Sequence, residues 1–283
     1  MSRLLITVFL IITTSLTNAA IITTTYVNLP QQAQSAFARA EVIWEQCLVT
    51  NAEIKIRVTG IERGPTGFAL PRGVRNLPHL PFADTWYPTA LANALNGKRD
   101  NDLDDMNIFM SLRTNWYYEG DVIQPEQTDY VNVAIHEIAH GLGISSGSFI
   151  PWQGEKIGQI GLPNEYVNYF QLSFALPELD GTPLVYDRFI KSANHSPITA
   201  FTNPSKDLAL ALSTEGIYFD GNRSGKVLVT PGNISHIPKQ ANAPTPVMLS
   251  NSGIGESIRK PDPILLSMLE DIGWTISEAC KNS

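Results

Sequence analysis

Five consecutive residues, His136-Glu137-Ile138-Ala139-His140, place a carboxylate and two imidazoles at a defined spacing. Residues four positions apart share one face of an α-helix, so both histidines can reach the same ion. Neutral imidazole is a good ligand for zinc. Glu137 lies about 100° around such a helix from His136, close to the ion without having to bind it. This is the position of a general base for a metal-bound water, so the motif predicts a hydrolytic zinc site.

The residues around the motif have the pattern of a buried helix. Thr128 can cap a helix that starts near Asp129, and the charge of Asp129 suits the positive end of the helix dipole. The helix is expected to run from Tyr130 to Leu142 and to be stopped by Gly141 and Gly143. Because ionisable side chains on a buried helix are costly without partners, this context favours a shared ion.

A catalytic zinc ion usually has three protein ligands and one open position, so one more ligand is needed. In metzincin peptidases the motif continues as H-E-x-x-H-x-x-G-x-x-H. Gly143 matches the glycine, but Ser146 stands where the third histidine would be. Of the two later histidines, His195 lies in a polar loop without a metal signature. His236 is followed twelve residues later by Met248 in the segment PVMLS, which is similar to a methionine turn.

Together, the segment HEIAHGLG, a long insertion, a lone histidine and a methionine turn resemble leishmanolysin-type metzincins and are similar to secreted bacterial zinc peptidases. The final LEDIGW of the last predicted helix also resembles theirs. The resemblance extends from Gln31 to Trp274 and is essentially absent between Gly147 and Pro231. It implies a zincin fold with one catalytic zinc ion, the ligands His136, His140 and His236, a methionine turn at Met248 and Glu137 as general base.

The resemblance also implies a zinc endopeptidase that acts on a protein or peptide substrate. Glu137 would take a proton from the zinc-bound water and pass it to the leaving amine. Metzincins bind the substrate as an extended strand beside an edge strand above the cleft. The stretch Asp105–Met110 resembles that edge strand.

Two alternatives remain open. Ser146 invites the hypothesis of a zincin-like binding or adhesion module that has lost catalysis, although a decayed site would have no need to keep Glu137. A gluzincin-type peptidase is the other hypothesis, because Glu165 follows the helix at roughly the distance of a gluzincin's glutamate ligand. Gluzincins normally have an aspartate four residues further on, and here that residue is Tyr169.

Hydrophobic periodicity predicts an α+β fold. An amphipathic helix is expected over Gln31–Leu48, and strands over Glu53–Val58 and Met106–Leu112. In the second half, the pattern indicates short helices at Tyr166–Leu176 and Lys206–Leu212, and a final helix at Pro263–Ile272.

These elements fit one two-lobed, zincin-like catalytic domain over residues 20–283. The N-terminal lobe, 20–146, would hold a small twisted mixed sheet and the zinc helix. Residues 147–230 are rich in Gly, Pro, Asn and Ser and are expected to form an insertion. The irregular C-terminal lobe, 231–283, would carry the methionine turn and the closing helix.

Residues 1–19 have the pattern of a signal peptide, with Arg3, the apolar run Leu4–Ile12 and a small-residue cleavage site at Ala19. The run is short for a bilayer span, so we expect a secreted or periplasmic protein without stable membrane insertion. Export favours a disulfide between the two cysteines, Cys47 and Cys280. A net charge of −7 and the absence of any basic run argue against a nucleic-acid partner.

Overall fold

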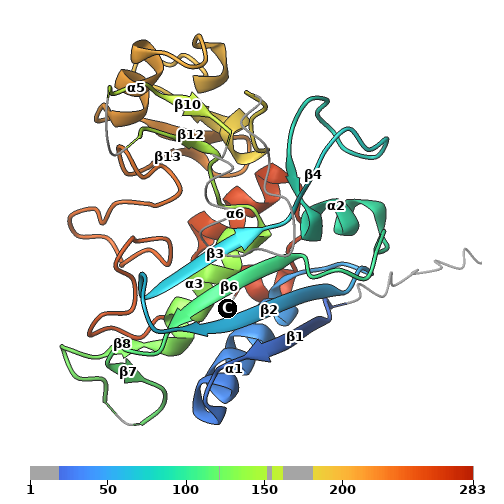
Figure 1. Ribbon diagram of the computed structural model, residues 1–283, viewed down its shortest axis with the longest axis vertical. Helices are drawn as coiled ribbons and strands as arrows, with labels where there is room; N and C mark the ends of the chain where they lie inside the picture. Colours follow the sequence, from blue (N-terminus) through green and yellow to red (C-terminus); the bar gives the residue numbers. More distant parts are fainter. Residues whose placement is uncertain (1–18, 121, 152–154, 162–180, 283) are drawn as a thin grey trace, which may run out of the picture.

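The computed structural model describes residues 19–120, 122–151, 155–161 and 181–282. Its architecture is mixed α+β, with one four-stranded sheet, several helices and smaller sheets of two or three strands (Figure 1). Residues 1–18 of the predicted signal peptide, the candidate ligand Glu165 and the predicted helix Tyr166–Leu176 lie outside the described residues.

The main sheet has the strand order β1-β2-β6-β3. Strands β1 (Ile22–Val27), β2 (Ile54–Ile61) and β6 (Met106–Ser111) are parallel, and β3 (Gly67–Pro71) runs antiparallel to β6. Along β2, buried and half-buried residues alternate, as its sequence predicts. All but the last residue of β6 are buried, because this strand has a neighbour on each side.

The prediction that Asp105–Met110 forms the edge strand is wrong. Strand β6 pairs with β2 on one side and with β3 on the other, so it has no free edge, and β3 is the edge strand instead. Strand β3 has only five residues, begins with glycine and ends with proline. Both residue types weaken the sequence signal of a strand.

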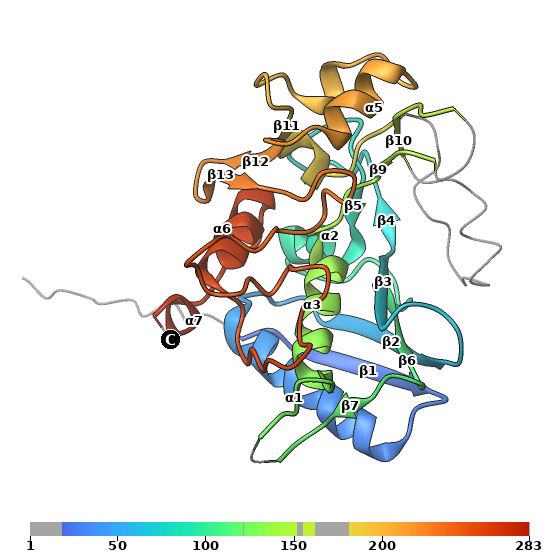
Figure 2. The same ribbon diagram turned by 90° about the vertical axis from the view of Figure 1, so that its left-hand side faces the viewer.

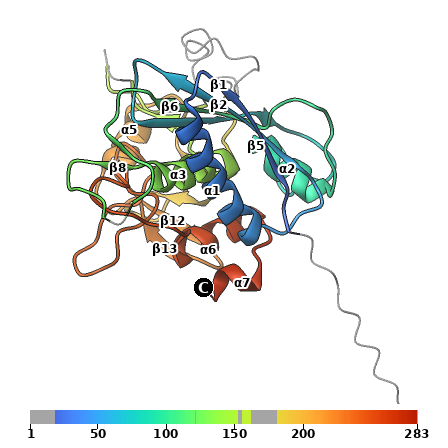
Figure 3. The same cartoon turned by 90° about the horizontal axis from the view of Figure 1, so that it is seen from below.

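Two helices, α1 (Gln31–Cys47) and α3 (Tyr130–Leu142), contact each other and cover one face of this sheet (Figures 2 and 3). Apolar residues of α1 recur at helical spacing and are buried: Ala33, Ala36, Phe37, Ala40 and Trp44. All thirteen residues of α3 are buried. The helix that carries the motif therefore lies in the interior, which holds its side chains in place.

The N-terminus of α3 differs in detail from the prediction. Asp129, and not Thr128, is the N-cap, and its side chain accepts a hydrogen bond from the Asn132 amide at 3.0 Å. Thr128 instead pairs in a short strand, where its amide donates to the Asn115 carbonyl at 2.9 Å. At the other end, Gly143 adopts φ 125° and caps the helix.

The remaining elements are short and surround this core. In the first half they are β4 (Gly73–Val74), β5 (Tyr87–Pro88), α2 (Thr89–Asn96), β7 (Trp116–Tyr117) and β8 (Thr128–Asp129). In the second half they are β9 (Ser148–Phe149), β10 (Gln159–Ile160), the 3₁₀ turns η1 (Tyr186–Phe189) and η2 (Ile198–Ala200), β11 (Ile190–Lys191), α5 (Lys206–Ser213), β12 (Tyr218–Gly221), β13 (Gly225–Leu228), α6 (Pro263–Ile272) and α7 (Glu278–Lys281).

Helices α5 and α6 confirm two predicted helices, but α6 is not the last one, because Ser277 caps the further short helix α7. The sulfur atoms of Cys47 and Cys280 lie at disulfide distance, 1.96 Å, and join the end of α1 to α7. None of the helices in the described part of the chain combines the length and the apolar character that crossing a bilayer requires.

Candidate metal centre

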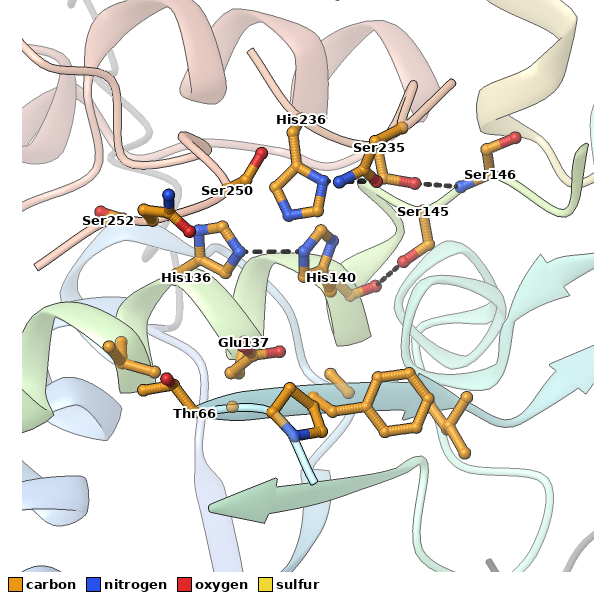
Figure 4. Close-up of a pocket in the computed structure, with 18 of the residues that line it drawn as sticks. Thr66, His136, Glu137, His140, Ser145, Ser146, Ser235, His236, Ser250 and Ser252 are labelled. Carbon is orange, nitrogen blue, oxygen red and sulfur yellow. Dashed lines mark hydrogen bonds between the residues drawn. The ribbon is translucent and has the colours of Figure 1, made fainter. Parts of the chain in front are cut away.

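The two histidines of the motif lie one turn apart on α3 and face the same cleft (Figure 4). Their side chains are buried, with 5% of His136 and 8% of His140 exposed. The two Nε2 atoms are 3.0 Å apart. Two nitrogens that each lie ~2.0–2.1 Å from one tetrahedral zinc ion are about 3.3 Å apart, so the spacing is close to that of two ligands of one ion.

A third imidazole joins them from a distant part of the chain. The ring centroid of His236 lies 5.2 Å from that of His136 and 5.0 Å from that of His140. One ligand nitrogen from each of the three histidines lies within 4.8 Å of the others. The group can therefore hold a metal ion, and in the described part of the chain it is the one such cluster of His, Cys, Asp or Glu side chains.

Each of these histidines is oriented by an oxygen near its Nδ1 atom. The Val247 carbonyl lies 2.7 Å from Nδ1 of His136, and the Ile144 carbonyl lies 2.6 Å from Nδ1 of His140. For His236 the partner is the Oδ1 atom of Asn233, at 2.8 Å. Because an oxygen acceptor favours a proton on Nδ1, the Nε2 lone pair of each ring is left for an ion.

Burial also favours the neutral form of these rings. It lowers the pKa of His136 from 6.5 to about 4 and that of His236 to about 3, and it lowers the pKa of His140 as well. The proximity of the other rings adds to this effect at His140 and His236. Near neutral pH all three imidazoles are therefore uncharged, which is the form that binds metal.

Glu137 lies on the adjacent face of α3, opposite strand β3 (Figure 4). Its side chain is 4% exposed, and its Oε2 atom has no hydrogen-bond partner among the described residues. Burial raises its pKa from 4.5 to about 8. A cation held by the neighbouring imidazoles would favour the ionised form of Glu137 and would therefore lower its pKa again.

Gly67 of β3 makes room for this carboxylate. A Cβ atom at this position would lie 2.5 Å from Glu137 Oε1 and 2.8 Å from a methyl carbon of Val133. Both distances are shorter than van der Waals contact allows. The edge strand therefore approaches α3 closely because residue 67 is a glycine.

The cleft between these elements has a volume of about 610 Å³. One wall is the stretch Pro65–Pro71, which includes β3, and the other contains Ser250, Asn251 and Ser252. Glu137 is the one carboxylate in the lining, and no lysine or arginine of the described residues contributes to it. One side of the cleft is therefore the edge of β3 that has no neighbouring strand in the sheet, and the walls are largely uncharged.

Met248 lies within the structure that supports the histidines. Its side chain is fully buried, and its carbonyl accepts a hydrogen bond from the Ile237 amide at 2.8 Å. The preceding carbonyl, of Val247, is the partner of His136. The turn around Met248 therefore links His136 on α3 with the segment that carries His236.

Other candidate residues lie elsewhere or have other partners. Ser146 donates its hydroxyl to the carboxylate of Asp187 at 2.5 Å. His195 is outside the cluster, and its Nδ1 atom lies 2.7 Å from the Tyr218 hydroxyl. Sequence reasoning missed the roles of Asn233, Gly67 and Asp187. Gly67 and Asp187 contact residues that are distant in sequence, and Asn233 contacts His236 three residues away in a segment without a periodic pattern.

Comparisons with known proteins bear on only part of the chain. The model of a family described as SPBPB7E8-like matches residues 85–159, a stretch that contains α3 and its motif but not His236. No curated protein and no solved structure matches the chain. The chain is therefore similar to this family over a region that is less than half of its length.

Proposed function

We propose that this protein is a secreted, zinc-dependent endopeptidase of the metzincin type, with a two-lobed zincin-like fold. The observation that carries the proposal is the convergence of three oriented imidazoles in an open cleft, beside a carboxylate whose Oε2 atom has no hydrogen-bond partner among the described residues. Three histidine nitrogens are an established ligand set for catalytic zinc, and they leave a position free for water. The donor set of His136, His140 and His236 therefore fits this ion.

A bound zinc ion would polarise the scissile carbonyl and lower the pKa of its water to about 7. Glu137 is the residue that handles the proton. No donor in the described part of the chain occupies its Oε2 atom, so the carboxylate can accept the proton of the water and later donate it to the leaving amine. Burial raises the pKa of Glu137, which makes the carboxylate a better proton acceptor than an exposed glutamate.

Strand β3 is the element that would bind the substrate backbone. It is the edge strand of the sheet and lines the cleft beside Glu137. An extended peptide can add to such an edge through main-chain hydrogen bonds, which bind any sequence. The peptide bond opposite the histidines would then be the one cleaved.

This arrangement favours an active enzyme over an inactive binding module. His236 provides a third imidazole, so Ser146 is not needed as a ligand. Burying the Glu137 carboxylate, whose Oε2 atom has no hydrogen-bond partner in the residues that the structure describes, costs stability, and a role in hydrolysis accounts for that cost.

The test is to compare wild-type protein with Glu137→Gln. Both are assayed for bound zinc and for cleavage of a denatured protein. Glutamine keeps the shape of the side chain but cannot accept the proton, so we expect one zinc ion per chain in both proteins and a loss of activity of ~10²–10⁴-fold in the variant. A wild-type protein that binds zinc without cleaving any peptide would favour the binding module.

A further inference from the structure

The third histidine lacks the rigid support of the other two. His136 and His140 lie on a buried helix, whereas His236 lies in an irregular segment between β13 and α6. A ligand on such a segment must be held by contacts with its surroundings, because ordering it costs conformational entropy. Two residues of the stretch 147–230, Tyr186 and Asp187 of η1, provide these contacts.

Tyr186 contacts the His236 segment directly. Its side chain is fully buried, and its hydroxyl donates a hydrogen bond to the Ile234 carbonyl at 2.7 Å. Its ring packs against that of Phe219 at a centroid distance of 5.3 Å, which anchors it in the core. The hydroxyl therefore fixes the backbone two residues before His236.

Asp187 acts on the same segment through Ser146. Its carboxylate is fully buried and accepts hydrogen bonds from the Ser146 hydroxyl at 2.5 Å and from the Gly147 amide at 3.1 Å. The Ser146 amide in turn donates to the Ser235 hydroxyl at 2.9 Å, directly before His236 in sequence. Figure 4 shows Ser146 and Ser235 side by side at the edge of the cleft.

This carboxylate is expensive to bury, because no lysine or arginine of the described residues forms an ion pair with it. It instead accepts hydrogen bonds from two segments. One contains Ser146 and Gly147, and the other provides the Leu184 amide at 3.0 Å. Such a group ties together segments that are far apart in sequence.

We propose that Tyr186 and Asp187 are positioning residues of the metal centre, which hold the His236 segment against the end of α3. The proposal rests on the function proposed above, because it assumes that His236 binds the ion. It gives the stretch 147–230 a role, and it gives Ser146 one as a link between Asp187 and Ser235. Substitution of residues that orient metal ligands typically weakens metal binding ~10–100-fold.

The experiment measures zinc affinity of the full chain by competition with a chromophoric chelator. The variants are Tyr186→Phe, which removes only the hydroxyl, Ser146→Ala, and Asp187→Asn. The control is Tyr26→Phe, because the Tyr26 hydroxyl donates to Glu41 at 2.8 Å, in the β1–α1 region away from the cleft. Urea unfolding of each metal-free protein shows whether it folds, and the visible spectrum of bound Co²⁺ reports the ligand geometry.

We expect Tyr186→Phe and Ser146→Ala to bind zinc ~10–100-fold more weakly than wild type, with a changed Co²⁺ spectrum, while Tyr26→Phe binds as wild type does. Wild-type zinc affinity and spectrum in both variants would overturn the positioning role, even if Asp187→Asn fails to fold. A wild-type protein that binds no zinc would instead refute the metal centre itself, and the positioning role with it.

Discussion

Replacing Gly67 by alanine tests how Glu137 is placed without substituting a candidate metal ligand or the base itself. The added methyl group would lie 2.5 Å from Oε1 and 2.9 Å from Cγ of Glu137, and 2.8 Å from a methyl carbon of Val133. All three distances are shorter than the ~3.5–4.0 Å of an optimal contact by 0.6 Å or more. Either β3 or the Glu137 side chain must therefore move by roughly 1 Å.

The expected effect on catalysis follows from this displacement. Misplacement of a reacting group by ~1 Å can reduce the rate ~10²-fold, which is within the ~10²–10⁴-fold that a general base contributes. Overpacking of this kind also destabilises a fold by ~1–3 kcal/mol. The three histidines proposed as ligands lie on the other side of Glu137 from β3 (Figure 4), so zinc content should not change.

The assay is kcat/KM for a peptide substrate, measured for Gly67→Ala, Glu137→Gln and the double variant. If the effect of the methyl group acts through Glu137, it should disappear in the Glu137→Gln background, because the base has already been lost. A Gly67→Ala enzyme with wild-type kcat/KM would refute the close approach of β3 to the base. An undiminished effect in the double variant would show that β3 acts through the substrate instead.

Three further predictions follow. In the metal-free protein the pKa of His136 is about 4, below its ordinary value of 6.5, so the unfolded state binds more protons between these pH values. The contribution of this ring to the free energy of unfolding, measured in urea with a chelator as the difference between wild type and His136→Gln, should therefore be fully present above pH 6.5 and fall as the pH drops towards 4, while the raised pKa of Glu137 acts in the opposite direction and is common to both proteins. A difference that does not change with pH would contradict the burial of this ring. Asn233→Leu should weaken zinc binding ~10-fold or more, whereas Asn233→Asp should preserve it, because only aspartate keeps an oxygen near Nδ1 of His236. Equal zinc affinities of the two variants in a chelator competition would speak against the orientation of His236 by Asn233. Peptides with lysine or aspartate beside the scissile bond should be cleaved more slowly than the matched alanine peptide, because the described walls around Glu137 and the histidines contain no lysine, no arginine and no further carboxylate to pair with these charges. A preference for either charged peptide in kcat/KM would count against these largely uncharged walls.

The local part of the site could be predicted from the sequence because its information is local. The spacing of His136 and His140 defines one helix face, and the structure has both residues on α3. Helices α1, α5 and α6 and strands β2 and β6 also follow from periodicity within one segment. The sequence predicts the N-cap one residue too early, at Thr128 instead of Asp129, because the pairing of Thr128 with Trp116 is not visible in local sequence.

The remainder depends on contacts between distant residues. His236 could be proposed only from its family-like setting, and no periodic pattern brings it to α3. The contacts of Tyr186 with Ile234 and of Asp187 with Ser146 join segments that have no shared motif. The prediction of the edge strand is wrong because strand order is a property of the whole sheet. The hydrophobic pattern of β6 does not reveal that β3 pairs with its second edge.

The central claim is that His136, His140 and His236 bind one zinc ion. Anomalous diffraction at the zinc absorption edge, from crystals of the zinc-loaded protein, tests it most directly. We expect a single strong peak ~2.0–2.1 Å from Nε2 of His136, His140 and His236, with Glu137 outside the first coordination shell. A peak that Glu165 or Glu137 coordinates in place of His236, or no peak at the three histidines, would contradict the account.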